Sequence, residues 1–296
     1  MPTYFGSIED VMEKLSGADY IADRALATVL YLANRLEKPI FLEGEPGVGK
    51  TEVGLVMARL FDVPLIRLQC YEGLDAATAL YEWNYPKQLL HIKLEETGEH
   101  DQKQIEKIIY GQDFLIKRPL LEAILRSKEK TPVLLIDEID RADEEFEAFL
   151  LEVLSDFQIT IPEMGTITAS KRPMVVVTSN RTRDVHDALK RRCLYHWIEY
   201  PSFEKEYRIV MAKIPGIEEH LATQIIQFIQ KLREEDLLKK PGVSETLDWA
   251  RALVALHEDH LDDAVISDTL GCILKYQEDI RRFREGLEAG GTGSSD

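Results

Sequence analysis

The segment GEPGVGKT constrains this 296-residue chain more than any other part of its sequence. Its spacing, G-x-x-x-x-G-K-[ST], is that of a phosphate-binding loop, in which glycines let successive backbone N–H groups converge on phosphate oxygens. Lys50 would reach the β- and γ-phosphates, and the Thr51 hydroxyl would coordinate Mg²⁺. The residues expected to bind nucleotide are Gly44, Glu45, Pro46, Gly47, Val48, Gly49, Lys50 and Thr51.

The loop also has the sequence context that a nucleotide site needs. A short apolar run bounded by proline and glycine, Ile40–Leu42, precedes it and indicates a buried strand. Apolar residues at helical spacing follow it, namely Val53, Val56, Met57 and Leu60. We therefore expect the loop to join a strand to a helix, whose positive N-terminal end favours a bound anion.

A hydrophobic run that ends in two carboxylates, VLLIDE at 133–138, supplies a second element of the predicted site. In phosphate-loop enzymes an Asp at this position binds Mg²⁺, and we assign that role to Asp137. The adjacent Glu138 is placed to polarise the attacking water as a general base. Acidic residues often follow strands, so we assign these roles to Asp137 and Glu138 because the phosphate loop lies upstream of them. With both elements present, we expect the chain to hydrolyse nucleotide as well as to bind it.

Strand-like runs alternate with helical patterns up to about residue 200. Apolar runs such as VLLI and MVVV are typical of parallel strands covered on both faces, and their alternation with helices predicts an α/β fold with a doubly wound, parallel, five-stranded sheet. The expected strands are 39–43, 64–70, 132–137, 174–179 and 196–200. The expected helices in this region are 21–35, 52–61, 118–127 and 143–155.

After Pro201 the strand signals stop, and a small all-helical unit follows. Its expected helices are 203–212, 217–233, 244–257 and 262–287. The sequence thus predicts an α/β nucleotide-binding domain at residues 1–200 and an α-helical lid at 201–289. The final segment, GGTGSSD at 290–296, is expected to be a flexible tail.

The predicted α/β domain contains two insertions. The segment 71–85 carries Tyr81, Trp83 and Tyr85 at alternate positions, which is strand-like spacing, and we expect a hairpin there. The segment 157–169 is expected to form a second hairpin around Pro162–Gly165. The charged run 95–107 is typical of a solvated surface. Either hairpin would contact a substrate or simply pack on the domain's own core.

Four motifs in order give the chain a resemblance to a known family: GEPGVGKT, VLLIDE, VVVTSN at 175–180 and ALKRRC at 188–193, followed by a helical lid. This arrangement resembles the core of an AAA+ ATPase over nearly the whole chain. Within that superfamily it resembles the MoxR family. The segments RLQCYEGLDAATALYEWNYPKQ and DALKRRCLYHWIEYP resemble the CoxD-type maturation factors of carbon monoxide dehydrogenase and related molybdenum hydroxylases.

The resemblance implies roles for further residues. Asn180 matches sensor 1, which would hold the attacking water near the γ-phosphate. Arg192 matches the arginine finger, which would complete a neighbouring subunit's site, although the adjacent Arg191 remains an alternative. A finger in trans implies a homo-oligomeric ring, expected to be a hexamer. Tyr20 and Ile21 lie where the family contacts adenine, and they fit an ordinary core equally well.

One position departs from the family pattern. Many relatives carry a sensor 2 arginine two residues after the serine of the lid segment that here reads Gly242–Thr246, and Thr246 stands in its place. Arg251 lies five residues further on, which on a helix is about 140° away from Thr246. Arg251 either approaches the nucleotide from another direction or the chain lacks this contact.

The overall composition of the chain limits the kinds of partner that we expect it to bind. The net charge of −17 disfavours DNA or RNA as the main partner, because phosphate contacts dominate nucleic-acid affinity. The three cysteines are far apart and indicate neither a disulfide framework nor a zinc site. The first residues lack the pattern of a signal peptide, and no apolar run is long enough to span a membrane. We expect a cytoplasmic protein that reaches a membrane only through a partner.

The resemblance implies a chaperone-like ATPase that uses ATP and Mg²⁺ to remodel a client protein. The implied client is an immature metalloenzyme subunit whose active-site metal or sulfur is being installed, and a partner with a von Willebrand factor A domain is expected on the same ground. Two other classes stay open from the sequence. One is a nucleic-acid-directed AAA+ motor, loader or restriction-type subunit. The other is a nucleotide-gated scaffold with negligible turnover, against which Glu138 argues.

Overall fold

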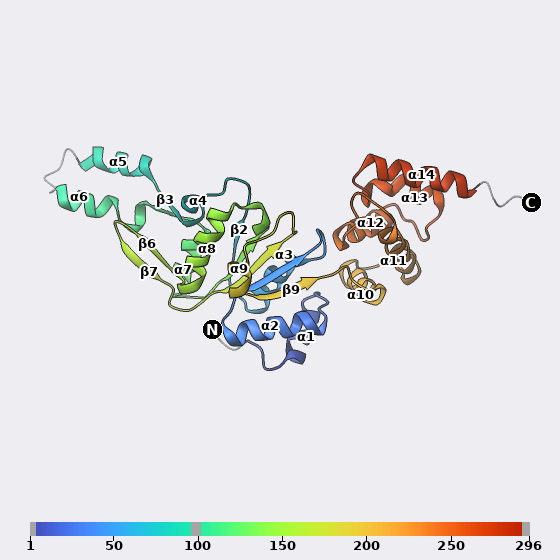
Figure 1. The fold of residues 1–296 in the computed structure, drawn as a ribbon, viewed down its shortest axis with the longest axis horizontal. Helices are drawn as coiled ribbons and strands as arrows, with labels where there is room; N and C mark the ends of the chain where they lie inside the picture. Colours follow the sequence, from blue (N-terminus) through green and yellow to red (C-terminus); the bar gives the residue numbers. More distant parts are fainter. Residues whose placement is uncertain (1–3, 96–101, 292–296) are drawn as a thin grey trace, which may run out of the picture. The chain divides into compact units, whose positions relative to one another are not determined.

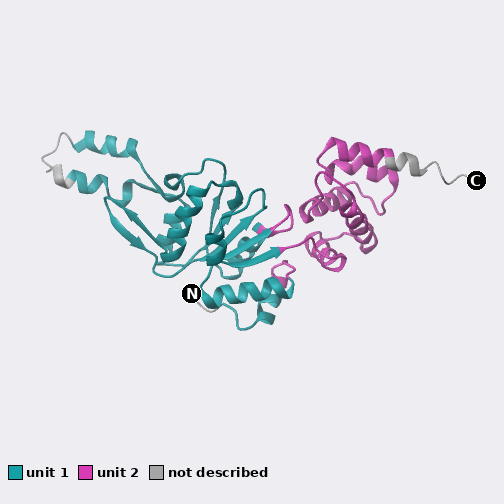
Figure 2. Cartoon of the chain, in the orientation of Figure 1, with its two compact units in different colours: residues 1–14, 23–43, 51–197 teal, residues 15–22, 44–50, 198–296 magenta. Residues whose placement is uncertain are grey.

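The computed structural model describes residues 4–95 and 102–291 (Figure 1). The chain divides into two compact units, which Figure 2 colours separately. The first comprises residues 1–14, 23–43 and 51–197, and the second comprises residues 15–22, 44–50 and 198–296. None of the helices in the described part of the chain has both the length and the apolar character that crossing a membrane requires.

The sheet of the α/β fold contains five strands within the described residues, in the order β2-β5-β8-β1-β9. The pairs β2–β5, β5–β8 and β1–β8 are parallel. The three inner strands β5, β8 and β1 are buried along their whole length, as expected of strands covered on both faces. The predicted α/β class with a doubly wound sheet is confirmed. The strands are β1 (Ile40–Gly44), β2 (Leu65–Gln69), β5 (Val133–Asp137), β8 (Met174–Ser179) and β9 (Leu194–Ile198).

Two long helices of this region begin where a side chain caps their free N–H groups. Asp23 accepts a hydrogen bond from Leu26 N and starts α2, and Asp143 accepts one from Phe146 N and starts α8. Phe146, Leu150, Val153 and Leu154 lie at helical spacing along α8 and are buried. The helices of this region are α1 (Ile8–Gly17), which the sequence patterns did not predict, α2 (Arg24–Leu36), α3 (Lys50–Leu60), α7 (Pro119–Arg126), α8 (Glu144–Asp156) and α9 (Asp187–Arg192).

The insertion between β2 and α7 differs from the prediction. The expected hairpin within 71–85 is wrong, because β3 (Tyr81–Trp83) pairs with the distant strand β4 (Leu115–Lys117). Trp83 is buried in the core, whereas Tyr85 is the first residue of a helix, where Pro86 is well tolerated. The remaining elements are α4 (Ala76–Leu80), α5 (Tyr85–Glu95), α6 (Gln102–Ile109) and a 3₁₀ turn at Gln112–Phe114. Residues 96–101 of the predicted charged run lie outside the described residues.

The second predicted hairpin is confirmed. Strand β6 (Gln158–Ile161) pairs in antiparallel fashion with β7 (Gly165–Thr168). The Thr160 and Thr166 hydroxyls lie 3.0 Å apart across the pair. Ile159 and Ile161 are buried, so this hairpin packs at least one face on the core of its own unit.

The helical region packs around the fully buried Trp249. A buried ion pair between Glu206 and Arg233 lies within it, with both guanidinium–carboxylate distances at 2.7 Å. The single helix expected over 262–287 is wrong: the chain forms α13 and α14, separated by a 3₁₀ turn at Leu270–Cys272 and the loop after it. The helices are α10 (Phe203–Lys213), α11 (Glu219–Glu234), α12 (Val243–Ala255), α13 (Asp263–Thr269) and α14 (Gln277–Gly291). Residues 292–296 of the predicted tail lie outside the described residues.

Candidate functional site

The predicted phosphate loop joins strand β1, which ends at Gly44, to helix α3, which begins at Lys50. Gly47 and Gly49 have φ angles of 77° and 94°, in the region that favours glycine over residues with a side chain. The strand–loop–helix context that the sequence predicts is therefore present, and the loop's shape depends on these two glycines.

Lys50 is the buried cation of this loop. Its side chain is 5% exposed, and Nζ donates hydrogen bonds to Gly44 O at 2.8 Å and to Glu45 O at 2.6 Å. The ammonium group thus lies against the loop's own backbone. Because an ammonium group carries three donors and a full positive charge, this position suits a side chain that contacts phosphate.

Asp137 stands at the end of β5 and is 2% exposed. Its Oδ1 accepts hydrogen bonds from Thr51 Oγ1 at 3.0 Å and from Thr178 Oγ1 at 2.5 Å. The structure therefore brings together Thr51 and Asp137, the two residues predicted to hold Mg²⁺. Their hydroxyl and carboxylate oxygens are the hard donors that Mg²⁺ prefers, so the residues present fit this cation.

Arg67 is a neighbour of Asp137 that sequence reasoning missed. Its Nε and Nη2 donate to Asp137 Oδ2 at 3.1 and 2.5 Å, and Nη2 also donates to Gln69 at 2.6 Å. Arg67 lies on β2, which pairs directly with β5, and half of its side chain is exposed. A guanidinium group therefore competes with any cation for the second oxygen of the predicted metal ligand.

Replacing Arg67 with alanine is expected to lower the Mg²⁺ concentration needed for half-maximal ATP binding by about fivefold or more. The reason is that a pair of unit charges about 4 Å apart interacts with about 1 kcal/mol even in bulk water. The measurement is titration of a fluorescent ATP analogue at increasing Mg²⁺. Arg59→Ala, which removes an exposed ion pair with Glu52, is the matched control. An Arg67→Ala protein that needed the same or more Mg²⁺ would contradict competition by the guanidinium.

The predicted water-polarising residue and the predicted sensor 1 residue lie side by side. Asn180 Nδ2 lies 3.4 Å from Glu138 Oε1, and Arg141 Nη1 lies 3.1 Å from Glu138 Oε2. Glu138 has a φ of 55°, and its backbone N–H donates to Thr178 Oγ1 at 2.9 Å. The ends of β5 and β8 thus present a carboxylate and an amide to the same place, next to Asp137.

Asp140 is a second residue that sequence reasoning missed. It is 2% exposed, and its carboxylate accepts hydrogen bonds from Asn180 N at 3.1 Å, Thr182 N at 2.9 Å and Thr182 Oγ1 at 2.7 Å. These contacts fix the backbone that leaves β8. Asp140 therefore positions Asn180 through its backbone, without touching its side chain. The only signal in the sequence was an acidic residue shortly after an apolar strand.

Glu43, at the end of β1, is also buried and was not predicted. Tyr195 OH donates to its Oε2 at 2.8 Å, and Lys190 Nζ lies 3.3 Å from its Oε1. Partial desolvation of its hydroxyl and the hydrogen bond to Glu43 raise the pKa of Tyr195 to about 12, although nearly half of the side chain is exposed. These contacts connect the strand before the phosphate loop to α9 and β9.

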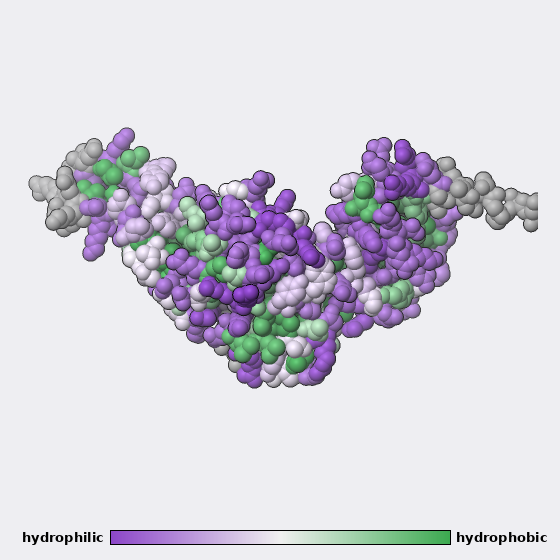
Figure 3. All heavy atoms as spheres, viewed as in Figure 1, coloured by the Kyte–Doolittle hydropathy of each residue, from purple (hydrophilic) through white to green (hydrophobic). Residues whose placement is uncertain are grey.

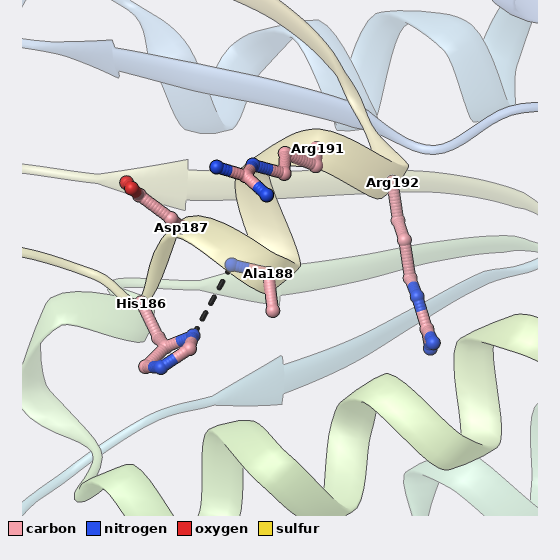
Figure 4. Close-up of a pocket in the computed structure, with 5 residues that line it drawn as sticks. All are labelled: His186, Asp187, Ala188, Arg191 and Arg192. Carbon is pink, nitrogen blue, oxygen red and sulfur yellow. Dashed lines mark hydrogen bonds between the residues drawn. The ribbon is translucent and has the colours of Figure 1, made fainter.

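Helix α9 presents the two candidate arginine fingers in different directions (Figure 4). Arg191 and Arg192 line a surface pocket with His186, Asp187 and Ala188. Arg192 Nη1 donates to Leu151 O and Ser155 Oγ at the end of α8. Arg191 is exposed and has no hydrogen-bond or ion-pair partner among the residues that the structure describes. Both arginines remain candidates.

The remaining predicted residues lie around α1, α2 and the lid. Tyr20 and Ile21 are half-buried in the segment between α1 and α2. Thr246 is fully buried inside the helical region, where Oγ1 donates to Glu206 Oε1 at 2.7 Å. Arg251 pairs with Asp248 at 3.0 Å on the exposed side of α12. Thr246 and Arg251 therefore both make their contacts within the helical region.

The loop at the end of one parallel strand and the carboxylates at the end of another define a P-loop nucleotide hydrolase. Residues 39–193, just over half of the chain, match the model of the AAA domain, dynein-related subfamily, and the chain belongs to this family of AAA+ ATPases. It is therefore an ATP hydrolase, with ATP as its nucleotide and Mg²⁺ as the usual cation. AAA+ ATPases commonly form oligomeric rings.

Curated relatives are distant. An uncharacterized protein of Staphylococcus epidermidis is 26% identical over 231 residues, which cover 76% of this chain and 78% of the relative. Gas vesicle ATPase GvpN1 of Halobacterium salinarum is 22% identical over 270 residues, covering 85% and 73%. Lon protease of Cytophaga hutchinsonii is 28% identical over 244 residues, but the match spans only 24% of that protein.

Among solved structures, the RuvB Holliday junction branch migration motor of Thermotoga maritima matches with a TM-score of 0.45 and 16% identity. The match covers 84% of this chain and 67% of that one.

Proposed function

We propose that this chain is a MoxR-type AAA+ ATPase with a nucleotide-binding domain at residues 1–200 and a helical lid at 201–289. Glu138 polarises the attacking water, Asn180 holds that water, and Lys50 contacts the β- and γ-phosphates. The observation that carries this assignment is the meeting of Glu138 and Asn180 at 3.4 Å from the ends of two different strands. Thr51 and Asp137 hold Mg²⁺, which neutralises phosphate charge when bound.

The chain works as a homo-oligomeric ring, with six subunits as the expected number. In this proposal Arg192, or Arg191 beside it, stabilises the charge on the phosphoryl group in a neighbouring subunit's site. Both arginines lie on the exposed side of α9, which supports a role at a subunit boundary. Tyr20 and Ile21 contact the adenine base.

The ATPase remodels a client protein. Support comes from helix α5, which projects with α6 from the first unit and exposes apolar side chains (Figure 3). Tyr85, Leu89, Leu90 and Leu94 are each about 60% or more exposed. Contiguous apolar surface of this kind marks protein-interaction sites more often than a plain solvated face.

The resemblance supports a more specific client. By that resemblance the client is an immature molybdenum-containing enzyme subunit, and a protein with a von Willebrand factor A domain acts as partner. The same resemblance places the work in the cytoplasm. A nucleic-acid-directed motor is the second candidate, and the net charge of −17 argues against it.

The test measures ATP turnover of the full chain with three probes: an apo molybdenum hydroxylase, the same enzyme in mature form, and double-stranded DNA. We expect the apo enzyme alone to raise turnover. The double variant Leu89→Glu, Leu90→Glu is expected to lose this stimulation and keep basal turnover, because two charges disrupt the apolar face of α5. Leu238→Glu changes another exposed leucine, 63% exposed on the lid, and should behave as the unmodified chain does. Stimulation by DNA would favour the motor, and no response to the apo enzyme would rule out this client.

A further inference from the structure

The carbonyl of Gly47, in the middle of the phosphate loop, is hydrogen-bonded by the first turn of lid helix α12. Val243 N donates to Gly47 O at 2.9 Å, and Ser244 N donates to it at 3.2 Å. All three residues belong to the second compact unit. We call this set of contacts the loop–lid clasp. The first N–H groups of a helix have no partner within the helix, so Gly47 satisfies two donors that would otherwise need water or a cap.

The clasp leaves no room for a side chain at Gly242. A Cβ atom on Gly242 would lie 2.7 Å from Pro46 O and 2.9 Å from Gly47 Cα. The φ angle of Gly242 is −83°, which any residue adopts, so its backbone does not require glycine. The close approach of the loop backbone, with Glu245 Oε2 a further 3.0 Å contact, therefore accounts for glycine at 242.

Two groups of contacts connect the clasp to the rest of the lid. The carboxylate of Glu245 accepts hydrogen bonds from Gly242 N at 3.0 Å and from Ser244 Oγ at 2.8 Å, which fixes the first turn of α12. Arg233 Nε donates to Pro241 O at 2.8 Å, and the same guanidinium is paired with the buried Glu206. The clasp is thus attached to α10 and α11 as well as to α12.

The clasp also determines the direction of one phosphate-facing amide. A peptide unit is planar, so the carbonyl of Gly47 and the N–H of Val48 point in opposite directions as one rigid group. When the lid holds Gly47 O, it also fixes the orientation of Val48 N–H, one of the loop amides expected to face phosphate. Conversely, any rotation of this peptide on phosphate binding must change the two bonds to α12.

We propose that the lid senses the nucleotide through this backbone clasp, which takes the place of the sensor 2 arginine that the family resemblance leads one to expect where Thr246 stands. Gly242, Val243 and Ser244 are positioning residues that act on the phosphate loop, and Thr246 instead holds α12 to Glu206 inside the lid. This inference rests on the proposed nucleotide site, and the experiment below distinguishes failure of the clasp from failure of that site. It also explains how a lid without a sensor 2 arginine at this position stays coupled to the loop.

The test compares Gly242→Ala with Gly271→Ala in the full chain. Gly271 also lies in the lid, but a Cβ atom there meets nothing within 4 Å, so this variant controls for loss of a glycine. We expect Gly242→Ala to bind ATP at least tenfold more weakly and to lose amide-exchange protection at Val243 and Ser244. In the unmodified chain, ATP should increase protection at the same two amides. Gly271→Ala should match the unmodified chain in both measurements.

A second variant covers the case in which Gly242→Ala does not fold. Val243→Pro deletes the shorter hydrogen bond at the first helical position, where proline is favoured, and should weaken ATP binding several-fold. An unmodified chain that bound no ATP would overturn the proposed site itself. Normal ATP binding by Gly242→Ala or Val243→Pro, or exchange at Val243 and Ser244 that ATP left unchanged, would overturn the clasp alone.

Discussion

The Lys50→Ala variant is expected to lose ATP binding by about 30-fold to several thousand-fold. Removing one partner of a buried, hydrogen-bonded charge pair costs about 2–5 kcal/mol, and the γ- and β-phosphates would be left without their cation. Lys50 is nearly fully buried, so solvent does not screen this interaction as it does at an exposed site. Isothermal titration with ATP and Mg²⁺ measures the loss directly.

Two comparisons make the Lys50 result specific. Lys239→Ala removes an exposed lysine from the second unit and should leave the affinity for ATP unchanged. Circular dichroism and thermal unfolding check that Lys50→Ala is folded, since this substitution also removes the hydrogen bonds to Gly44 O and Glu45 O. A folded Lys50→Ala protein with normal affinity would end the assignment of GEPGVGKT as the phosphate loop.

The strands that the sequence predicted most directly, β1, β5 and β8, each bury a continuous run of residues. Strands β5 and β8 are buried at every position, so their apolar runs indicate parallel strands without any knowledge of their neighbours. The insertion was harder because its helix α5 exposes Leu89 and Leu90 instead of burying one face. Its strand β3 pairs with β4, more than 30 residues away, and no local pattern reports such a pairing.

The residues of the candidate site also fall into those that the sequence predicted and those that it did not. Lys50 and Thr51 belong to a motif whose spacing specifies the chemistry, and Asp137 could be assigned because that motif lies upstream of it. Arg67 and Glu43 lie in strands with no motif, and their partners are set by the order of strands in the sheet. Arg67 contacts Asp137 because β2 pairs with β5, and this order is a tertiary property that the sequence did not provide.

The helical region shows why spacing could not decide whether Arg251 replaces the expected sensor 2 arginine. The resemblance leads us to expect an arginine where Thr246 stands, and the helical angle alone could not tell whether Arg251 replaces it. In the structure the Thr246 hydroxyl donates to Glu206 inside the helical region, and Arg251 pairs with Asp248. Both outcomes depend on which face of α12 packs against α10 and α11, which is decided by the buried Trp249 and its neighbours.

Replacing Arg192 with alanine is expected to preserve ATP binding and to reduce turnover by about a thousandfold or more, the usual effect of removing an arginine finger. The decisive measurement mixes this variant with Glu138→Gln subunits, which bind ATP but lack the water-polarising carboxylate. In a mixed ring, an intact Arg192 from a Glu138→Gln subunit faces an intact Glu138 in its neighbour, so part of the turnover should return.

Two further variants separate the finger from its surroundings. Arg191→Ala tests the neighbouring guanidinium, which has no partner among the described residues. If mixing with Glu138→Gln subunits restored turnover to Arg191→Ala but not to Arg192→Ala, the finger would be Arg191. Ser155→Ala removes one acceptor of Arg192 within its own subunit and leaves the guanidinium in place. If Ser155→Ala lost as much turnover as Arg192→Ala, the arginine would act by holding α9 to α8. Because an arginine that works only within its own subunit cannot be replaced by its neighbour's, absence of any rescue would exclude a shared site.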